Sequence, residues 1–149
     1  MSLNAKKKKI VGLGAAAVTL TEDMSDSVQL FDTAIEAFTL PVITALNIGM
    51  KFTFVTTVAA STAQSVTAGA AADLYTGGVR LWDDTAAYTA PQVVIHKADV
   101  SNDIILTMNG TTKGGKIGSK VTFTAISATR WFVDGDLFGS GNLSTTVFS

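Results

Sequence analysis

Apolar and polar residues alternate most regularly in the middle of the 149-residue chain, between residues 38 and 58. Phe52 and Phe54 stand two positions apart with polar residues between them, which is the period of a half-buried β-strand. A shorter alternation before this strand stops at Pro41, whose missing N–H ends a strand or places it at a sheet edge. The pattern predicts a strand, a connection through Gly49 and a longer strand whose phenylalanines anchor a core.

Short segments of the same kind recur along the chain, at residues 27–31, 79–82, 92–96, 103–108, 120–126 and 130–133. Turn residues separate them, most clearly Gly77-Gly78 and Asn109-Gly110. About eight short strands separated by turns favour an antiparallel sandwich or barrel. We therefore predict an all-β fold, an antiparallel β-sandwich or barrel of jelly-roll type, in one domain spanning residues 18–149.

The last two strong strand segments form a predicted hairpin. Its first strand places Phe123 on the apolar face, and its second strand places Trp131 where the two rings can meet. We expect Trp131 to be a core residue that packs on Phe123. Trp82 stays open between a core position and an exposed platform for a sugar or a partner, because two aspartates follow it. From residue 139 onward we expect a polar tail.

Composition excludes several classes of protein. Cysteine is absent, so the chain has no disulfide framework, thiol nucleophile or zinc-thiolate site. No apolar run is long enough to span a membrane. Four of the eleven basic residues stand at positions 6–9, and residues 10–149 carry seven basic and twelve acidic residues, a net charge of −5. A nucleic-acid binder would spread its basic residues over the folded face, so we expect neither nucleic acid nor membrane as a partner.

Residues 1–17 combine the lysine run with two glycines and a short apolar stretch. Such a segment resists packing, so we expect a flexible basic N-terminal arm that orders only on a partner. A secretory signal is the alternative, although its apolar part is short and is interrupted by Gly12 and Gly14. The same glycines imitate a dinucleotide fingerprint, but a strand pattern follows them where that motif needs a helix.

The chain contains no complete catalytic constellation. Residues 110–117 fall one residue short of a P-loop, because Ile117 stands where a hydroxyl should hold magnesium and a strand follows. His96 is the only histidine, and no Gly-x-Ser-x-Gly elbow accompanies it. Asp134 and Asp136 lack the spacing of a calcium loop and are interpreted as turn residues. We expect no enzymatic activity, no cofactor and no metal site.

Five short motifs follow one another along roughly residues 17–141: Phe38-Thr-Leu-Pro41, Gly49-Met-Lys-Phe-Thr-Phe-Val55, Gly77-Gly78-Val79, Asn109-Gly110-Thr111 and Trp131-Phe-Val-Asp-Gly135. Their order resembles that of the small head decoration (cement) proteins of tailed bacteriophages. The resemblance implies a structural virion protein without catalytic residues, which binds the outer surface of the assembled head. Such a protein is commonly a homotrimer and clamps neighbouring subunits of the major capsid protein.

Two alternatives stay open. Related β-modules of phage fibre proteins share the Thr-Leu-Pro and Trp-x-Val-x-Gly pieces, so a receptor- or glycan-binding module of a phage tail fibre or a bacterial surface structure is the second interpretation. A secreted bacterial hydrolase is the third.

Candidate contact residues follow from the decoration interpretation. The arm would find an acidic capsid surface by charge, with apolar residues behind the lysines for a groove. Its candidates are Lys6, Lys7, Lys8, Lys9, Ile10, Val11 and Leu13. Residues 43–48 are more apolar than the small-residue linker that the resemblance implies there. They supply the candidates for contact between protomers, Ile43, Leu46 and Ile48.

Overall fold

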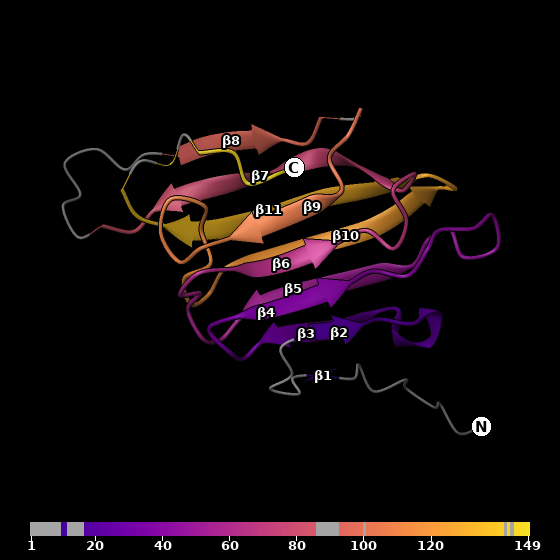
Figure 1. The fold of residues 1–149 in the computed structure, drawn as a ribbon, viewed down its shortest axis with the longest axis horizontal. Coiled ribbons are helices and arrows are strands. Elements are labelled where there is room, and N and C mark those ends of the chain that lie inside the picture. Colours follow the sequence, from indigo (N-terminus) through magenta and orange to yellow (C-terminus); the bar gives the residue numbers. More distant parts are fainter. Residues whose placement is uncertain (1–9, 12–16, 86–92, 100, 142, 144) are drawn as a thin grey trace, which may run out of the picture.

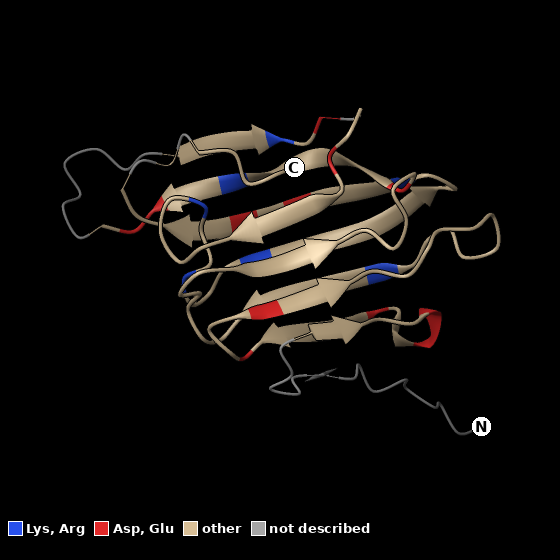
Figure 2. Ribbon diagram, in the orientation of Figure 1, with Lys and Arg blue, Asp and Glu red and all other residues tan. Residues whose placement is uncertain are grey.

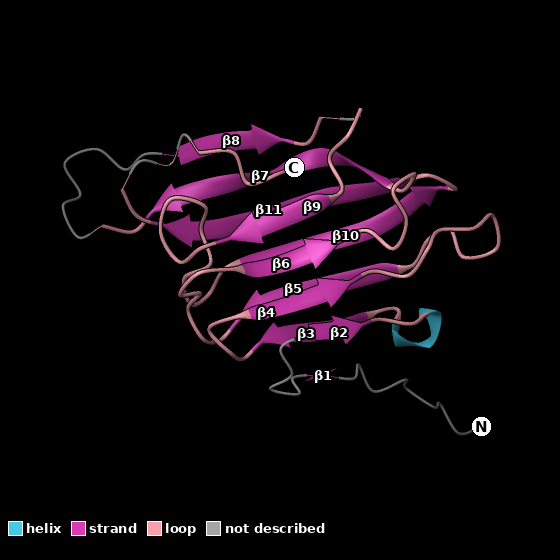
Figure 3. Ribbon diagram, in the orientation of Figure 1, coloured by secondary structure: helices cyan, strands magenta, loops and turns pink. Residues whose placement is uncertain are grey.

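The computed structural model describes residues 10–11, 17–85, 93–99, 101–141, 143 and 145–149. Across these residues the chain forms β-strands in two sheets that face each other, and Figure 3 shows one short helical turn, η1 (Glu22–Met24). The all-β prediction is confirmed. Among the described residues, no helix has the length and apolarity needed to cross a bilayer.

The larger sheet has seven strands and the smaller sheet has four (Figure 1). In spatial order, the seven-stranded sheet consists of β1 (Ile10–Val11), β3 (Ser27–Phe31), β5 (Lys51–Thr56), β10 (Lys120–Ser127), β11 (Arg130–Gly139), β7 (Leu74–Asp83) and β8 (Val93–Lys97). The four-stranded sheet consists of β2 (Ala17–Thr19), β4 (Glu36–Thr39), β6 (Gln64–Thr67) and β9 (Ile105–Met108).

Both sheets are mixed, so the prediction of an antiparallel fold is wrong in this respect. From β1 to β7 the chain alternates between the two sheets, and β3 therefore lies parallel to β1 and β5, as β4 lies parallel to β2 and β6. Parallel neighbours require a crossover connection, and here each crossover is itself a strand of the opposite sheet. An alternating pattern reports which faces are buried but carries no information about strand direction.

The C-terminal hairpin of β10 and β11 lies between β5 and β7. β10 runs antiparallel to both β5 and β11, whereas β11 runs parallel to β7. Trp131 is fully buried, as predicted, but it stands opposite Ala125, and its aromatic contact is with Phe52 at a centroid distance of 6.1 Å. The expected packing of Trp131 on Phe123 is corrected accordingly, because Phe123 stands opposite Val133 in the hairpin register.

The core lies between the sheets and is rich in aromatic rings. Phe31 and Phe54 of the larger sheet contact Phe38 of the smaller one at centroid distances of 5.1 and 5.2 Å. Phe123 continues the cluster to Tyr75, whose hydroxyl donates to the carbonyl of a residue in β6 at 3.0 Å. The period of two predicts the inward positions of Phe38, Phe54 and Phe123. Tyr75 lies before residues 79–82, the segment that the sequence predicts as a strand, because β7 begins at Leu74.

The C-terminal segment belongs to the fold, contrary to the expectation of a polar tail. Residues 147–149 lie along the outer edge of β9, where Ser149 and Ile105 exchange backbone hydrogen bonds of 2.8 and 3.0 Å. Phe148 is almost fully buried and contacts the ring of Tyr75. His96 Nε2 lies 2.8 Å from the carbonyl oxygen of Leu143, and this hydrogen bond ties the chain just before the C-terminal segment to β8.

Candidate functional site

The outer face of the seven-stranded sheet carries a row of charged and apolar side chains on adjacent strands. Figure 2 shows that most of the ribbon is uncharged, which makes a cluster of charges on adjacent strands conspicuous. The register places Lys120, Asp136, Arg80 and Ile95 side by side across β10, β11, β7 and β8. Every second residue of each strand points outward, so the row is presented to solvent.

Asp136 organises this row. Its carboxylate accepts two hydrogen bonds from Arg80, at 2.7 and 3.0 Å, and a third from the indole N–H of Trp82 at 2.8 Å. The hydrogen bond from Arg80, and after it that from Trp82, lowers the pKa of Asp136 below its ordinary value. Asp134, one outward position along β11, lies 3.7 Å from Arg80. The arginine and the tryptophan are therefore held in defined positions on an exposed surface.

A hollow of about 440 Å³ opens beside this row, between β7 and β8. Its lining residues are Thr76, Gly77, Gly78, Val79, Arg80, Ile95, Lys97 and Ala98. A side chain is excluded at Gly78, because a Cβ there would lie 2.4 Å from the carbonyl oxygen of His96. The lining contains two cations and no carboxylate.

Four large apolar side chains are exposed on this face, and one of them, Ile95, lines the hollow. Ile95 is 67% exposed, Phe132 44% and Trp82 37%, and Val93 is exposed next to them. We name this surface, made of Arg80, Trp82, Val93, Ile95, Lys97, Phe132, Asp134 and Asp136, the outer platform. Exposed aromatic residues together with a fixed arginine are the composition of protein–protein hot spots. The arrangement suits binding of a macromolecular surface.

Most of the candidate residues of the arm lie outside the described residues, namely Lys6, Lys7, Lys8, Lys9 and Leu13. Ile10 and Val11 form β1, which pairs with β3 opposite Val28 and Gln29. The structure thus gives a backbone position for two of the seven capsid-contact candidates and does not bring them to the outer platform, since β1 and β8 are the two ends of the sheet.

The three candidates for contact between protomers are separated in the structure. Ile43 is buried in the core, and its backbone N–H donates to the carboxylate of Asp73 at 2.9 Å. Leu46 is 99% exposed and Ile48 about half exposed in the loop before β5. Only Leu46 and Ile48 are therefore available at the surface.

The glycine-rich segment that approximates a P-loop is a closed structural loop. Gly110 N–H donates to Gly114 C=O at 2.7 Å, and Asn109 Oδ1 accepts from the backbone N–H groups of Thr111 and Lys113 at 3.0 and 2.9 Å. A P-loop keeps such amides free for phosphate. Here the loop uses them itself.

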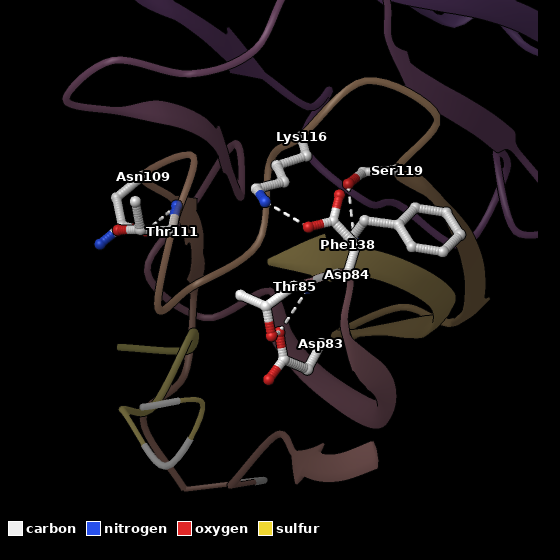
Figure 4. Close-up of polar contacts among 8 residues, drawn as sticks. All are labelled: Asp83, Asp84, Thr85, Asn109, Thr111, Lys116, Ser119 and Phe138. Atoms are coloured by element: carbon white, nitrogen blue, oxygen red, sulfur yellow. Dashed lines mark hydrogen bonds and ion pairs between the residues drawn. The ribbon is translucent and has the colours of Figure 1, made fainter. Parts of the chain in front are cut away.

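The rest of this loop is tied to the ends of neighbouring strands (Figure 4). Lys116 pairs with Asp84 at the end of β7, and Ser119 Oγ accepts from the backbone N–H of Phe138 at 2.9 Å. Asp83 accepts from the backbone and hydroxyl of Thr85, and these bonds lower the pKa of Asp83. Lys116 and Ser119 therefore connect this loop to the chain after β7 and to β11, whereas Asp83 closes a local turn with Thr85.

A group of buried polar atoms lies inside the sandwich, at the end where β3 leads into β4. Glu36 and Gln64 are register partners on β4 and β6, and both side chains are buried. Glu36 Oε2 accepts from the backbone N–H of Asp32 at 3.0 Å, whereas Glu36 Oε1 and Gln64 Oε1 have no hydrogen-bond partner within the described part of the chain. Burial raises the pKa of Glu36 above its ordinary value.

The chain carries no assembled metal site in the residues that the structure describes, since no three His, Cys, Asp or Glu side chains gather there. Comparison with known proteins adds no assignment: no family model, curated protein or solved structure matches this chain.

Sequence reasoning left Trp82 open and missed its partners. Asp134 and Asp136 were expected in a turn, but they lie within β11, which extends to Gly139. The available signal was their spacing of two, in phase with Phe132 and opposite to the buried Val133.

Proposed function

We propose that this protein is a structural virion protein, a decoration protein that binds the outer surface of an assembled phage head and stabilises contacts between major capsid protein subunits. The resemblance of its ordered motifs to head decoration proteins supports this proposal. The observation that carries it is the outer platform, an exposed surface in which Arg80 and Trp82 are already oriented by Asp136. Preorganised side chains reduce the entropy lost on binding.

The proposal includes self-association as a homotrimer. Leu46 and Ile48 are apolar side chains exposed in one loop, and a contact between protomers would remove them from water. The basic arm would act as a tether that finds acidic capsid surface, so attachment should weaken as salt rises. Many copies on one shell would then give firm binding without any single tight site.

Binding to undecorated heads tests the proposal. Purified protein is mixed with heads, the heads are sedimented, and bound copies are counted at low and high salt. We expect many copies spread over the shell, with weaker binding for Trp82→Ala and for a chain lacking residues 2–9, which keeps β1; each variant should keep its melting temperature nearly unchanged. Absence of binding by the wild-type protein would refute the decoration function.

A receptor- or glycan-binding module is the second candidate, and the exposed Trp82 favours it specifically, since it stands one outward position along β7 from Arg80, which lines the hollow. Aromatic faces and polar neighbours are the groups that such a site would use. Particle analysis separates the two functions, because a fibre module would be present in few copies at the tail. A glycan that quenches the fluorescence of the wild-type protein but not of Trp82→Phe would support the second candidate.

A further inference from the structure

The edge strand β8 exposes backbone hydrogen-bonding groups. Ala98 N–H donates to Gly77 C=O at 3.1 Å, and in an antiparallel ladder every second residue back from Ala98 then faces β7 as well. The intervening residues, Val93, Ile95 and Lys97, turn their N–H and C=O groups to the open side of the sheet. No backbone partner for these groups exists among the described residues.

Other edges of the fold are covered by the chain itself. Residues 147–149 lie along β9, and β1 lies along β3. β8 lacks such cover within the described residues, and it also lacks the usual protections of an edge, having no proline, no bulge and only one charge, at Lys97. An edge strand with exposed Val93 and Ile95 is a template for pairing with another strand.

The hollow beside this edge indicates the chemistry of the partner strand. Ile95 forms an apolar wall, and Arg80 and Lys97 are the charged groups of the lining. Arg80 is engaged by Asp136, whereas Lys97 makes no ion pair with any described residue. A partner side chain that lies against Ile95 should be apolar. The next partner side chain on the same face, two positions along, would meet Lys97 and should be a carboxylate.

We propose that β8 and the hollow bind an extended strand of a partner protein, which continues the seven-stranded sheet and whose outward-facing residues, two positions apart, are alternately apolar and acidic. Main-chain hydrogen bonds to Val93, Ile95 and Lys97 would supply affinity, and the hollow with Lys97 would supply selectivity. For the identity of the partner the inference rests on the proposed function, in which the strand comes from a capsid subunit.

Hydrogen exchange with a defined peptide tests the edge directly. The probe is an eight-residue peptide with blocked ends, Thr-Val-Thr-Glu-Thr-Val-Thr-Glu, in which valine and glutamate alternate along one face of the strand, and the control replaces each glutamate with lysine. We expect the glutamate peptide to slow amide exchange of Ile95 and Lys97 and the lysine peptide to leave it unchanged. Equal effects of both peptides, or no effect of either, would overturn the proposal.

Two variants separate backbone pairing from side-chain contact. Ile95→Pro removes an N–H that points away from β7, so the existing ladder is kept, and Ile95→Thr removes the apolar wall but keeps the N–H. Ile95→Pro should bind the glutamate peptide about tenfold more weakly than Ile95→Thr, because backbone hydrogen bonds to the partner are lost. Equal affinities of the two variants would refute pairing at this edge.

If the melting curve of Ile95→Pro shows that it does not fold, Lys97→Glu provides a second test. This variant should reverse the preference from the glutamate to the lysine peptide, and an unchanged preference would refute the assigned chemistry. Protection of β8 that rises with protein concentration in the absence of peptide would show a second copy as the occupant and overturn the assignment to a partner. Wild-type protein that binds the peptide but not phage heads would refute the decoration function alone.

Discussion

Substitution of Glu36 by glutamine should stabilise the protein at neutral pH. Glu36 is 1% exposed, and its Oε1 atom lies on the same inner face as Gln64 Oε1, with both atoms lacking a donor among the described residues. Gln64 Nε2 already donates to the carbonyls of Thr33 and Val58 at 2.8 and 2.7 Å, which fixes the orientation of its amide. Two buried acceptor atoms therefore belong to side chains that are neighbours in the sheet register.

A glutamine at position 36 keeps the acceptor for Asp32 N–H and brings an amide N–H for Gln64 Oε1. One new buried hydrogen bond contributes about 0.5–1.5 kcal/mol to the free energy of unfolding. The proton adds a pH dependence, because burial raises the pKa of Glu36 in the folded protein above its ordinary value of 4.5. Above pH 4.5 the folded state then holds a proton that the unfolded state has released, so wild-type stability falls as pH rises through this window.

Glu36→Gln lacks this proton, so its advantage over the wild-type protein should be small near pH 4 and should reach about 1 kcal/mol or more near pH 7. Urea unfolding followed by tryptophan fluorescence at both pH values measures the difference. Glu22→Gln is the matched control, because it removes the same charge from an exposed side chain. If Glu36→Gln were no more stable than the wild-type protein near pH 7, the pairing of Glu36 with Gln64 would be refuted.

Three further experiments, two with substitutions and one with a deletion, examine the packing. Trp131→Ala should lower the free energy of unfolding by about 3–5 kcal/mol, since the indole is fully buried, and an unchanged urea midpoint would contradict the core assignment. Gly114→Ala should destabilise by more than Gly141→Ala: both glycines have positive φ angles, but only at Gly114 would a Cβ approach Leu137 Cβ to 2.7 Å. Equal melting temperatures of these two variants would rule out crowding. Removal of residues 147–149 should uncover β9 and promote association in light scattering, and a monomer of unchanged melting temperature would show that this cover is dispensable.

The buried faces of the strands were predictable from the sequence, whereas the strand neighbours were not. Phe52, Phe54 and Phe123 occupy the inward positions that their spacing of two predicts. Their partners depend on strands far apart in the chain, such as β5 beside β10, and no local turn specifies that pairing. The residue pattern of one strand does not show whether the chain next crosses to the opposite sheet. The mixture of parallel and antiparallel strands was therefore not predictable.

The candidate site was predictable only in part. Trp82 was left open, and its exposure on the outer face agrees with the platform alternative. Asp136 was assigned to a turn because Asp and Gly are turn formers, and only the long pairing of β11 with β7 places it beside Arg80. The role of the lysine run as a tether and the trimer remain predictions.

The insertion of β10 and β11 between β5 and β7 has a consequence for biosynthesis. The centre of the seven-stranded sheet is made last, and the 56 residues that follow Asp83, up to Gly139, take roughly 3–11 s to synthesise. During this time β5 and β7 have no neighbour in the gap between them, and unpaired strand edges invite pairing with other nascent chains. Arg80 and Trp82 leave the ribosome early but acquire Asp136, the carboxylate that orients them, only when β11 arrives. An incomplete chain would therefore carry the residues of the outer platform without presenting the surface, so that only finished molecules compete for a partner.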